Sequence, residues 1–154
     1  MKRLLVPAAA AAAAVLVFAV LNATAGNSRA KAGGSIHVIE HATTDAVTNG
    51  TAGDSAGNVL TFANDVYDAA DAHKVGSDQG YCIRTVVGAT WECNWTTFLP
   101  EGQITVEGPF SDTGDTVVAV TGGTGAYRNT RGSMQLIYHN PAGTKFDFVF
   151  NLVG

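Results

Sequence analysis

Charged residues are scarce in this chain, and basic residues are scarcer than acidic ones. Of its 154 residues only 14% are charged, with nine Lys or Arg against 13 Asp or Glu. The few basic residues form no cluster, so the sequence lacks the positive surface with which proteins bind nucleic acid or anionic membranes. We therefore expect no nucleic-acid partner and no membrane partner for the folded domain.

Long hydrophobic runs are absent except at the N-terminus. Lys2 and Arg3 precede an uncharged apolar run over residues 4–21, and Ala23-Thr24-Ala25 follows as a small-x-small cleavage site. This order is typical of a secretory signal peptide, which predicts a secreted, extracellular protein. A permanent N-terminal anchor is the alternative, because the run approaches the length that spans a bilayer.

Cleavage after Ala25 would leave an acidic mature chain with seven basic and 13 acidic residues, a net charge of −6. Residues 1–25 are then the signal peptide, and the small, polar residues 26–34 (GNSRAKAGG) form a flexible tether. Residues 35–154 remain as one domain, which is long enough to enclose a single core.

Helical patterns are almost missing as well. Only residues 68–73 (DAADAH) have helical preference, for one or two turns. Seven of the 18 glycines fall within residues 102–132, where short β-branched runs alternate with predicted turns at 108–109, 112–115 and 122–125. Turns at such short intervals favour an antiparallel meander over a helix bundle.

Eight segments have the alternation or composition of strands. They are residues 35–41, 59–67, 75–86, 90–99, 103–106, 116–120, 133–139 and 145–153. Residues 43–58 are predicted to be a long loop at the rim of an opening. Eight strands joined by short turns predict an all-β fold, a closed eight-stranded antiparallel β-barrel, because closure removes the exposed sheet edges. A two-sheet sandwich is the alternative.

Cysteine occurs only twice, at Cys82 and Cys93. If Val87-Gly88 is a hairpin turn and Val86 pairs with Ala89, the two cysteines lie directly opposite on neighbouring strands. In an exported protein this predicts a disulfide within the hairpin. A reactive thiol is the less favoured alternative.

Two tryptophans share one strand face with a cysteine. Trp91, Cys93 and Trp95 alternate along residues 90–99, and Cys82 and Arg84 share a face of the partner strand. If these faces point inward, two indoles and the sulfur atoms line the barrel, which suits a flat or extended apolar ligand. The same side chains would equally fill a solid core.

Several segments in order resemble those of the allene oxide cyclase family, and the glycine-rich block also resembles dirigent proteins. The matching segments are 58–67 (NVLTFANDVY), 74–76 (KVG), 80–82 (GYC), 104–110 (ITVEGPF), 115–125 (DTVVAVTGGTG) and, for the dirigent proteins, 122–132 (GGTGAYRNTRG). The resemblance covers residues 59–154 and implies an eight-stranded antiparallel barrel that assembles as a homotrimer.

The resemblance implies an isomerase that closes an unstable epoxide into a ring by confining it in an apolar tunnel. It places a catalytic carboxylate at Glu40, an amide for the substrate oxygen at Asn64, and pocket positions at Cys82 and Phe110. A carboxylate can stabilise a developing cation, and an amide or its bound water can hold an epoxide oxygen.

Two positions depart from the family pattern. Ala42 stands where the family has an asparagine two residues after its glutamate, and Phe110 stands where it has a tyrosine, so one amide and one hydroxyl are missing. A disulfide at Cys82 would be a third difference.

Other polar residues offer weaker signals. Arg84, Arg128 and Arg131 are candidates to receive a ligand carboxylate, although pairing with surface Asp is the more common use of arginine. The four histidines share no ligand spacing, so we expect no metal site. Glu40 could also be a solvated charge at a strand end, and Asn64 a turn residue.

The sequence thus predicts an exported barrel that guides the cyclisation or coupling of a reactive apolar small molecule, without a cofactor. The partner would be a fatty-acid, polyketide or phenolic compound. Glu40 and Asn64 are the candidate catalytic residues, and the candidate ligand-binding residues are Phe62, Cys82, Trp91, Trp95 and Phe110. The alternative is a barrel that binds a lipid or metabolite without converting it.

Overall fold

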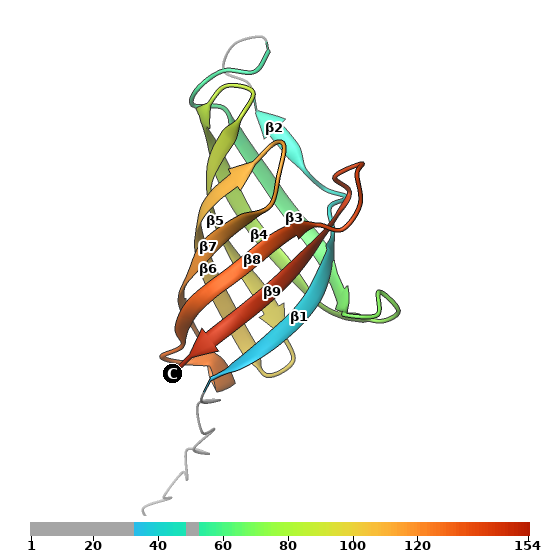
Figure 1. The fold of residues 1–154 in the computed structure, drawn as a ribbon, viewed down its shortest axis with the longest axis vertical. Helices are drawn as coiled ribbons and strands as arrows, with labels where there is room; N and C mark the ends of the chain where they lie inside the picture. The colour runs from blue at the N-terminus through green and yellow to red at the C-terminus, as the bar shows by residue number, and fades with distance from the viewer. Residues whose placement is uncertain (1–32, 49–52) are drawn as a thin grey trace, which may run out of the picture.

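A computed structural model describes residues 33–48 and 53–154; the predicted signal peptide and most of the predicted tether lie outside this range. The described chain is almost entirely strand (Figure 1). Its elements are β1 (Gly34–His41), β2 (Ala46–Thr48), β3 (Val59–Asp68), β4 (Lys74–Val86), β5 (Thr90–Leu99), β6 (Gly102–Ser111), β7 (Thr116–Gly123), η1 (Gly125–Tyr127), β8 (Arg131–Tyr138) and β9 (Lys145–Val153). No helix within these residues is long and apolar enough to cross a membrane.

The sheet closes on itself through β1. Strands β3 to β9 pair antiparallel with their neighbours in chain order. β1 pairs with β9 along its whole length, and its second half, from Val38 to His41, also pairs with Asp65–Asp68 of β3. This double pairing makes a closed eight-stranded antiparallel barrel, as the sequence predicts, and the two-sheet sandwich is wrong.

Within the loop predicted over residues 43–58, the described residues include a short strand. β2 pairs with the start of β3, where Ala46 lies opposite Thr61 and Thr48 opposite Val59. β2 has no second neighbour among the described strands and lies outside the closed barrel. The eight barrel strands therefore carry a ninth, short strand at one end (Figure 1).

The predictions of helical structure at residues 68–73 and of a turn at residues 108–109 are wrong. Residues 69–73 form a turn instead of a helix, because Asp68 accepts a hydrogen bond from the N–H of Ala72 at 2.9 Å and Asp71 adopts a left-handed conformation (φ 55°). Gly108 and Pro109 lie inside β6 and form no turn. The β6–β7 ladder ends at Glu107, so Pro109, which lacks an N–H, lies where β6 is paired only with β5.

The barrel interior follows the predicted alternation. In β9 the buried side chains are Phe146, Phe148, Phe150 and Leu152, and in β5 Trp91, Cys93 and Trp95 are all at most 5% exposed. At the end that carries η1, the Tyr127 side chain is buried in the core and donates a hydrogen bond to Glu101 at 3.1 Å. The opposite end carries β2 and the loops after β1, β4, β6 and β8 (Figure 1).

The β4–β5 hairpin has the predicted cysteine register. Cys82 lies opposite Cys93 with the Cα atoms 4.0 Å apart, and the two form a disulfide. The expected Val86–Ala89 pair is wrong, because the register shifts after Arg84 and Val86 pairs with Thr90. A bulge next to the turn thus leaves the pairing of the strand body intact.

Gly80 makes room for one of the inward tryptophans. It lies opposite Trp95, and a Cβ at Gly80 would overlap the Cβ of Trp95 and the backbone of Asn94. Backbone atoms of a central strand cannot retreat as a flexible side chain can, so the overlap would strain the β4–β5 ladder.

We predict that Gly80→Ala lowers the free energy of unfolding by about 1–3 kcal/mol, because it overpacks the barrel wall. Chemical denaturation monitored by tryptophan fluorescence measures the change. Gly114→Ala is the matched control, since no atom lies within 4 Å of a Cβ at Gly114. Equal denaturation midpoints for the two variants would show that Gly80 is not required by packing.

Candidate active site

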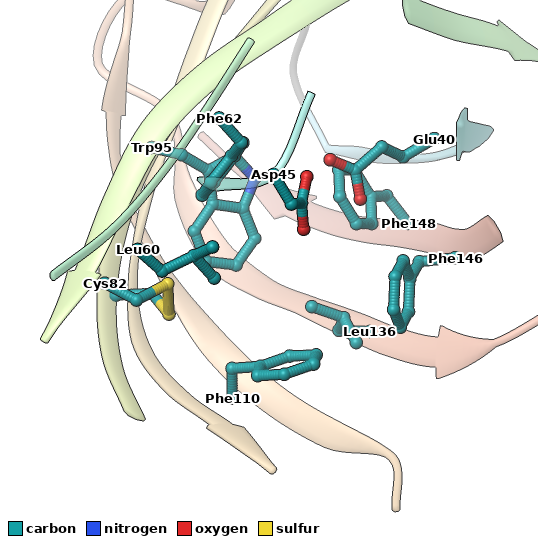
Figure 2. Close-up of a pocket in the computed structure, with 11 residues that line it drawn as sticks. Glu40, Asp45, Leu60, Phe62, Cys82, Trp95, Phe110, Leu136, Phe146 and Phe148 are labelled. Atoms are coloured by element: carbon teal, nitrogen blue, oxygen red, sulfur yellow. A yellow bond between two sulfur atoms is a disulfide. The ribbon is translucent and has the colours of Figure 1, made fainter. Parts of the chain in front are cut away.

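An apolar pocket with an acidic edge lies inside the barrel, toward the β2 end. Figure 2 shows its residues, which come from seven barrel strands and from the rim loop, the loop predicted over residues 43–58. They are Glu40, Asp45, Leu60, Phe62, Cys82, Cys93, Trp95, Phe110, Leu136, Phe146 and Phe148. The cavity is small, with a volume of about 40 Å³. A ligand larger than a few water molecules therefore requires the walls to move.

Asn64 holds the carboxyl groups of Glu40 and Asp45, which form the acidic edge of the pocket. Its side-chain NH₂ donates to Glu40 Oε1 at 2.8 Å and to Asp45 Oδ1 at 2.9 Å. Its side-chain oxygen accepts from the backbone N–H groups of Thr43 and Thr44 and from the Thr44 hydroxyl, each at 3.0 Å. One buried amide thus joins β1, β3 and the rim loop, with the carboxyl groups of Glu40 and Asp45 turned toward each other (Figure 2).

Asp78 is a further buried carboxyl group beside this amide. It is 1% exposed, and its Oδ1 accepts the backbone N–H of Asn64 at 3.3 Å. Its second oxygen finds no hydrogen-bond donor in the described part of the chain. A proton on Asp78 resolves this, because the neutral carboxyl can then donate to Glu40.

Burial keeps both acids from ionising at their usual pH. Desolvation raises the pKa of Glu40 to about 7, aided by the nearby Asp45 charge and opposed by the hydrogen bonds from Asn64 and Asp78. Desolvation and then the Glu40 charge raise the pKa of Asp78 to about 9. The two carboxyls therefore share protons near neutral pH, as coupled acids do. Such a pair can donate a hydrogen bond or proton and can also carry a negative charge.

The structure brings most of the predicted site residues together. Glu40 and Asn64 form one hydrogen-bonded cluster, and Phe62, Cys82, Trp95 and Phe110 line the pocket next to it. Cys82 presents a disulfide sulfur and no thiol. Glu40 is 6% exposed, so the alternative of a solvated charge at a strand end is wrong.

Trp91 is placed differently from its neighbour Trp95. It is buried, but it does not line the pocket, because the Arg84 guanidinium stacks 3.9 Å from its ring centroid and its indole N–H donates to Asp112 at 3.0 Å. Arg84 in turn pairs with Asp54 at 2.8 Å and Asp112 at 2.6 Å. These contacts tie the rim loop and the β6–β7 loop to the β4–β5 hairpin.

The sequence analysis missed Asp78, which lies behind the pocket, and several residues that line it. Asp78 carried a usable signal, since it alternates with Cys82 and Arg84 and therefore had to face the interior. Phe146, Phe148 and Leu136 carried the same alternation signal. Asp45 carried none, because its position depends on how the rim loop folds back onto Asn64.

The structure is a closed β-barrel that contains an apolar pocket with an acidic edge. Residues 36–149 match the family described as "Allene oxide cyclase barrel like domain", and the chain belongs to this family.

Solved structures share the barrel at low sequence identity. One is described as a pyocyanin demethylase, with 24% identity, a TM-score of 0.66, and coverage of 78% of this chain and 100% of the other. A pterocarpan synthase dirigent protein has 18% identity, a TM-score of 0.63 and coverage of 82% and 99%. An exo-specific intermolecular Diels-Alderase has 18% identity, a TM-score of 0.60 and coverage of 79% and 98%. These similarities show a shared fold.

We predict that the buried carboxyl pair makes the protein less stable as the pH rises from 6 to 9. The pKa values of Glu40 and Asp78 are higher in the folded state than in the unfolded chain. Between pH 6 and pH 9 the folded state therefore binds more protons than the unfolded state, and the free energy of unfolding falls as the pH rises. The stability that the two carboxyl groups contribute is present at low pH and is lost as the pH rises through their folded-state pKa values.

Asp78→Asn should flatten this dependence, because an amide stays neutral and can still donate to Glu40. We expect the variant to gain at least about 1 kcal/mol relative to the wild type between pH 6 and pH 9, since one pKa unit corresponds to about 1.4 kcal/mol. Denaturant titrations at several pH values measure it. The control is Asp65→Asn, which removes a half-exposed carboxylate paired with Lys74. Parallel pH profiles for Asp78→Asn and the wild type would contradict the shared-proton pair.

Proposed function

We propose that this protein is a secreted isomerase that confines a reactive, largely apolar small molecule and guides its cyclisation or coupling. The observation that carries the proposal is the enclosed aromatic pocket with a buried carboxyl pair at one edge. Its family membership and the barrel-shaped neighbours support the same class of chemistry.

The aromatic walls supply the confinement. Trp95 packs against Phe148 with ring centroids 5.8 Å apart, and Phe110 packs edge-on against Phe146 at 5.7 Å. Such interlocked rings restrict the shapes that a flexible substrate can adopt, which favours one ring-closing geometry over the others. The protein contributes orientation and exclusion of water, and the reactive substrate contributes the driving force.

The carboxyl pair supplies the polar chemistry. As a neutral acid, the pair can donate a hydrogen bond to a substrate oxygen that gains negative charge, while an ionised Glu40 can stabilise a positive charge that develops on carbon. Asn64 fixes the Glu40 carboxyl through a 2.8 Å hydrogen bond and acts as a positioning residue. A ring closure of this kind rearranges the bonds of one molecule and neither adds nor removes atoms.

The similar structures are named for reactions of small organic molecules: demethylation of pyocyanin, synthesis of pterocarpans and a Diels-Alder cycloaddition. These names agree in the size class of the substrate and differ in the reaction. The N-terminal pattern of the sequence supports export, and the Cys82–Cys93 disulfide is the kind of bond that persists outside the cell.

We predict that Glu40→Gln slows turnover about 100-fold or more, because it removes a carboxyl group that handles charge in the transition state. The assay incubates the protein with unstable epoxides and polyenes that cyclise spontaneously and follows the rate and enantiomer ratio by chiral chromatography. The wild type should accelerate one substrate and give mainly one enantiomer. Confinement by the walls should preserve part of that enantiomeric excess in the variant.

Glu92→Gln is the matched control, since Glu92 alternates with the inward residues of β5 and is exposed. It should turn over substrate like the wild type. Equal rates for Glu40→Gln and the wild type would contradict the role of Glu40. Tight capture of a substrate without any product would contradict the isomerase and identify a non-catalytic binding barrel. Native mass spectrometry of protein from its own host supplies the ligand class independently.

A further inference from the structure

The ionisable side chains that line the pocket are all acidic. Glu40 and Asp45 line it, Asp78 lies behind them, and no Lys, Arg or His belongs to the lining within the described chain. The rest of the wall is aromatic, aliphatic or disulfide. The electrostatic potential at the acidic edge is therefore negative, and no positive side chain of the lining offsets it.

Arg84, a buried cation of the β4–β5 hairpin, already has anionic partners. Arg84 is 8% exposed, pairs with both Asp54 and Asp112, and has its flat face on Trp91. It cannot leave two carboxylates to receive a third from a ligand without exposing both partners. The sequence-based alternative, in which Arg84 receives a ligand carboxylate, loses its support.

Hydrogen-bond donors at the acidic edge are also occupied. The two N–H groups of the Asn64 amide point to Glu40 and Asp45, at 2.8 and 2.9 Å. An anionic headgroup placed here would meet two carboxyl groups and no free donor from the amide. A fatty-acid carboxylate would therefore have to stay outside the pocket.

One polar atom of the pocket wall has no partner in the described residues. The indole nitrogen of Trp95 is buried, in a side chain that is 3% exposed, and it makes no hydrogen bond. A buried N–H without an acceptor costs stability, and native structures keep such groups where a ligand or water completes them. Since Trp95 lines the pocket, a bound molecule with an acceptor atom would satisfy it.

The aromatic walls attract a positively charged ligand, as the acidic edge does. Phe146, Phe148 and Trp95 stand around the space into which Glu40 and Asp45 point (Figure 2). The face of an aromatic ring carries partial negative charge and attracts cations, most strongly where water is excluded. Ring faces and carboxyl groups thus act together on one ligand.

We propose that the pocket selects a flat aromatic ligand that carries a positive charge, such as a protonated or N-alkylated heteroaromatic ring, and rejects anions. This inference rests on the proposed function and narrows its substrate class. The cavity of about 40 Å³ has to widen to admit such a ring. Once the walls move apart, the charged ring lies among the aromatic side chains with its positive end at Glu40 and Asp45, and an acceptor atom of the ligand completes the Trp95 N–H.

Three probes of nearly equal shape separate charge from hydrophobicity. They are N-methylquinolinium, its neutral analogue 1-methylnaphthalene, and the anion 1-naphthoate. Equilibrium dialysis at pH 7.5 and low salt gives the three dissociation constants for the intact protein. We expect the cation to bind about tenfold or more tightly than the neutral analogue, and the anion to bind more weakly than either.

Two variants assign the preference to the acidic edge. Glu40→Gln and Asp45→Asn each remove one carboxyl group, and Asp45 is exposed on the rim, where a substitution does not disturb the core. Each should reduce the preference for the cation about threefold or more while leaving the affinity for 1-methylnaphthalene unchanged. The control Asp65→Asn removes the same charge from the outside of the barrel and should leave all three constants unchanged.

The outcomes separate this inference from the function on which it rests. Equal affinity for the cation and the neutral analogue, or tighter binding of 1-naphthoate, overturns the charge selection and leaves the confinement catalyst standing. The same shift in Asp65→Asn as in Asp45→Asn also overturns it, because net charge alone would then explain the preference. Failure of all three probes to bind counts against the pocket as a small-molecule site and hence against the proposed function.

Discussion

The hydrogen bonds of Asn64 hold the functional end of this barrel together. The amide is 1% exposed, and it satisfies Glu40 on β1, Asp45 on the rim and the backbone of Thr43 and Thr44 at the same time. The barrel closes where β1 pairs with β3, and Asn64 directly precedes the β3 residues of that pairing. The position of the rim loop and the orientation of the two carboxyl groups therefore depend on one buried side chain, whose loss would leave several polar groups unsatisfied.

This arrangement buries acids at a cost that folding alone does not explain. Glu40 and Asp78 lie where water cannot solvate a charge, and the raised pKa values express that cost. Apolar residues of similar size would stabilise the barrel better. Buried, perturbed acids beside an apolar pocket are characteristic of functional sites, because a group that titrates near neutral pH can both hold and release a proton. Burial of the two carboxyl groups thus both destabilises the fold and gives the pair the raised pKa values that the proposed chemistry uses.

The sequence predicted the parts of this structure that follow from alternation and missed those that depend on contacts between distant segments. The period of two in β9 and the equal spacing of Cys82 and Cys93 from the hairpin turn specified inward faces and the disulfide. The resemblance to a family located Glu40 and Asn64. Asp45 and the role of Arg84 over Trp91 were not accessible, because both depend on how the rim loop packs. The turn predicted at Gly108-Pro109 was wrong, since a proline is tolerated where a strand is not paired with a second neighbour.

A proton-sharing pair of Glu40 and Asp78 has a distinct titration. Carbon-13 NMR of the side-chain carboxyl groups, followed over a pH titration of the folded protein, measures it. The pair should titrate in two steps, with apparent pKa values near 7 and near 9. Titration of both groups near pH 4, the range of solvated carboxyls, would contradict it.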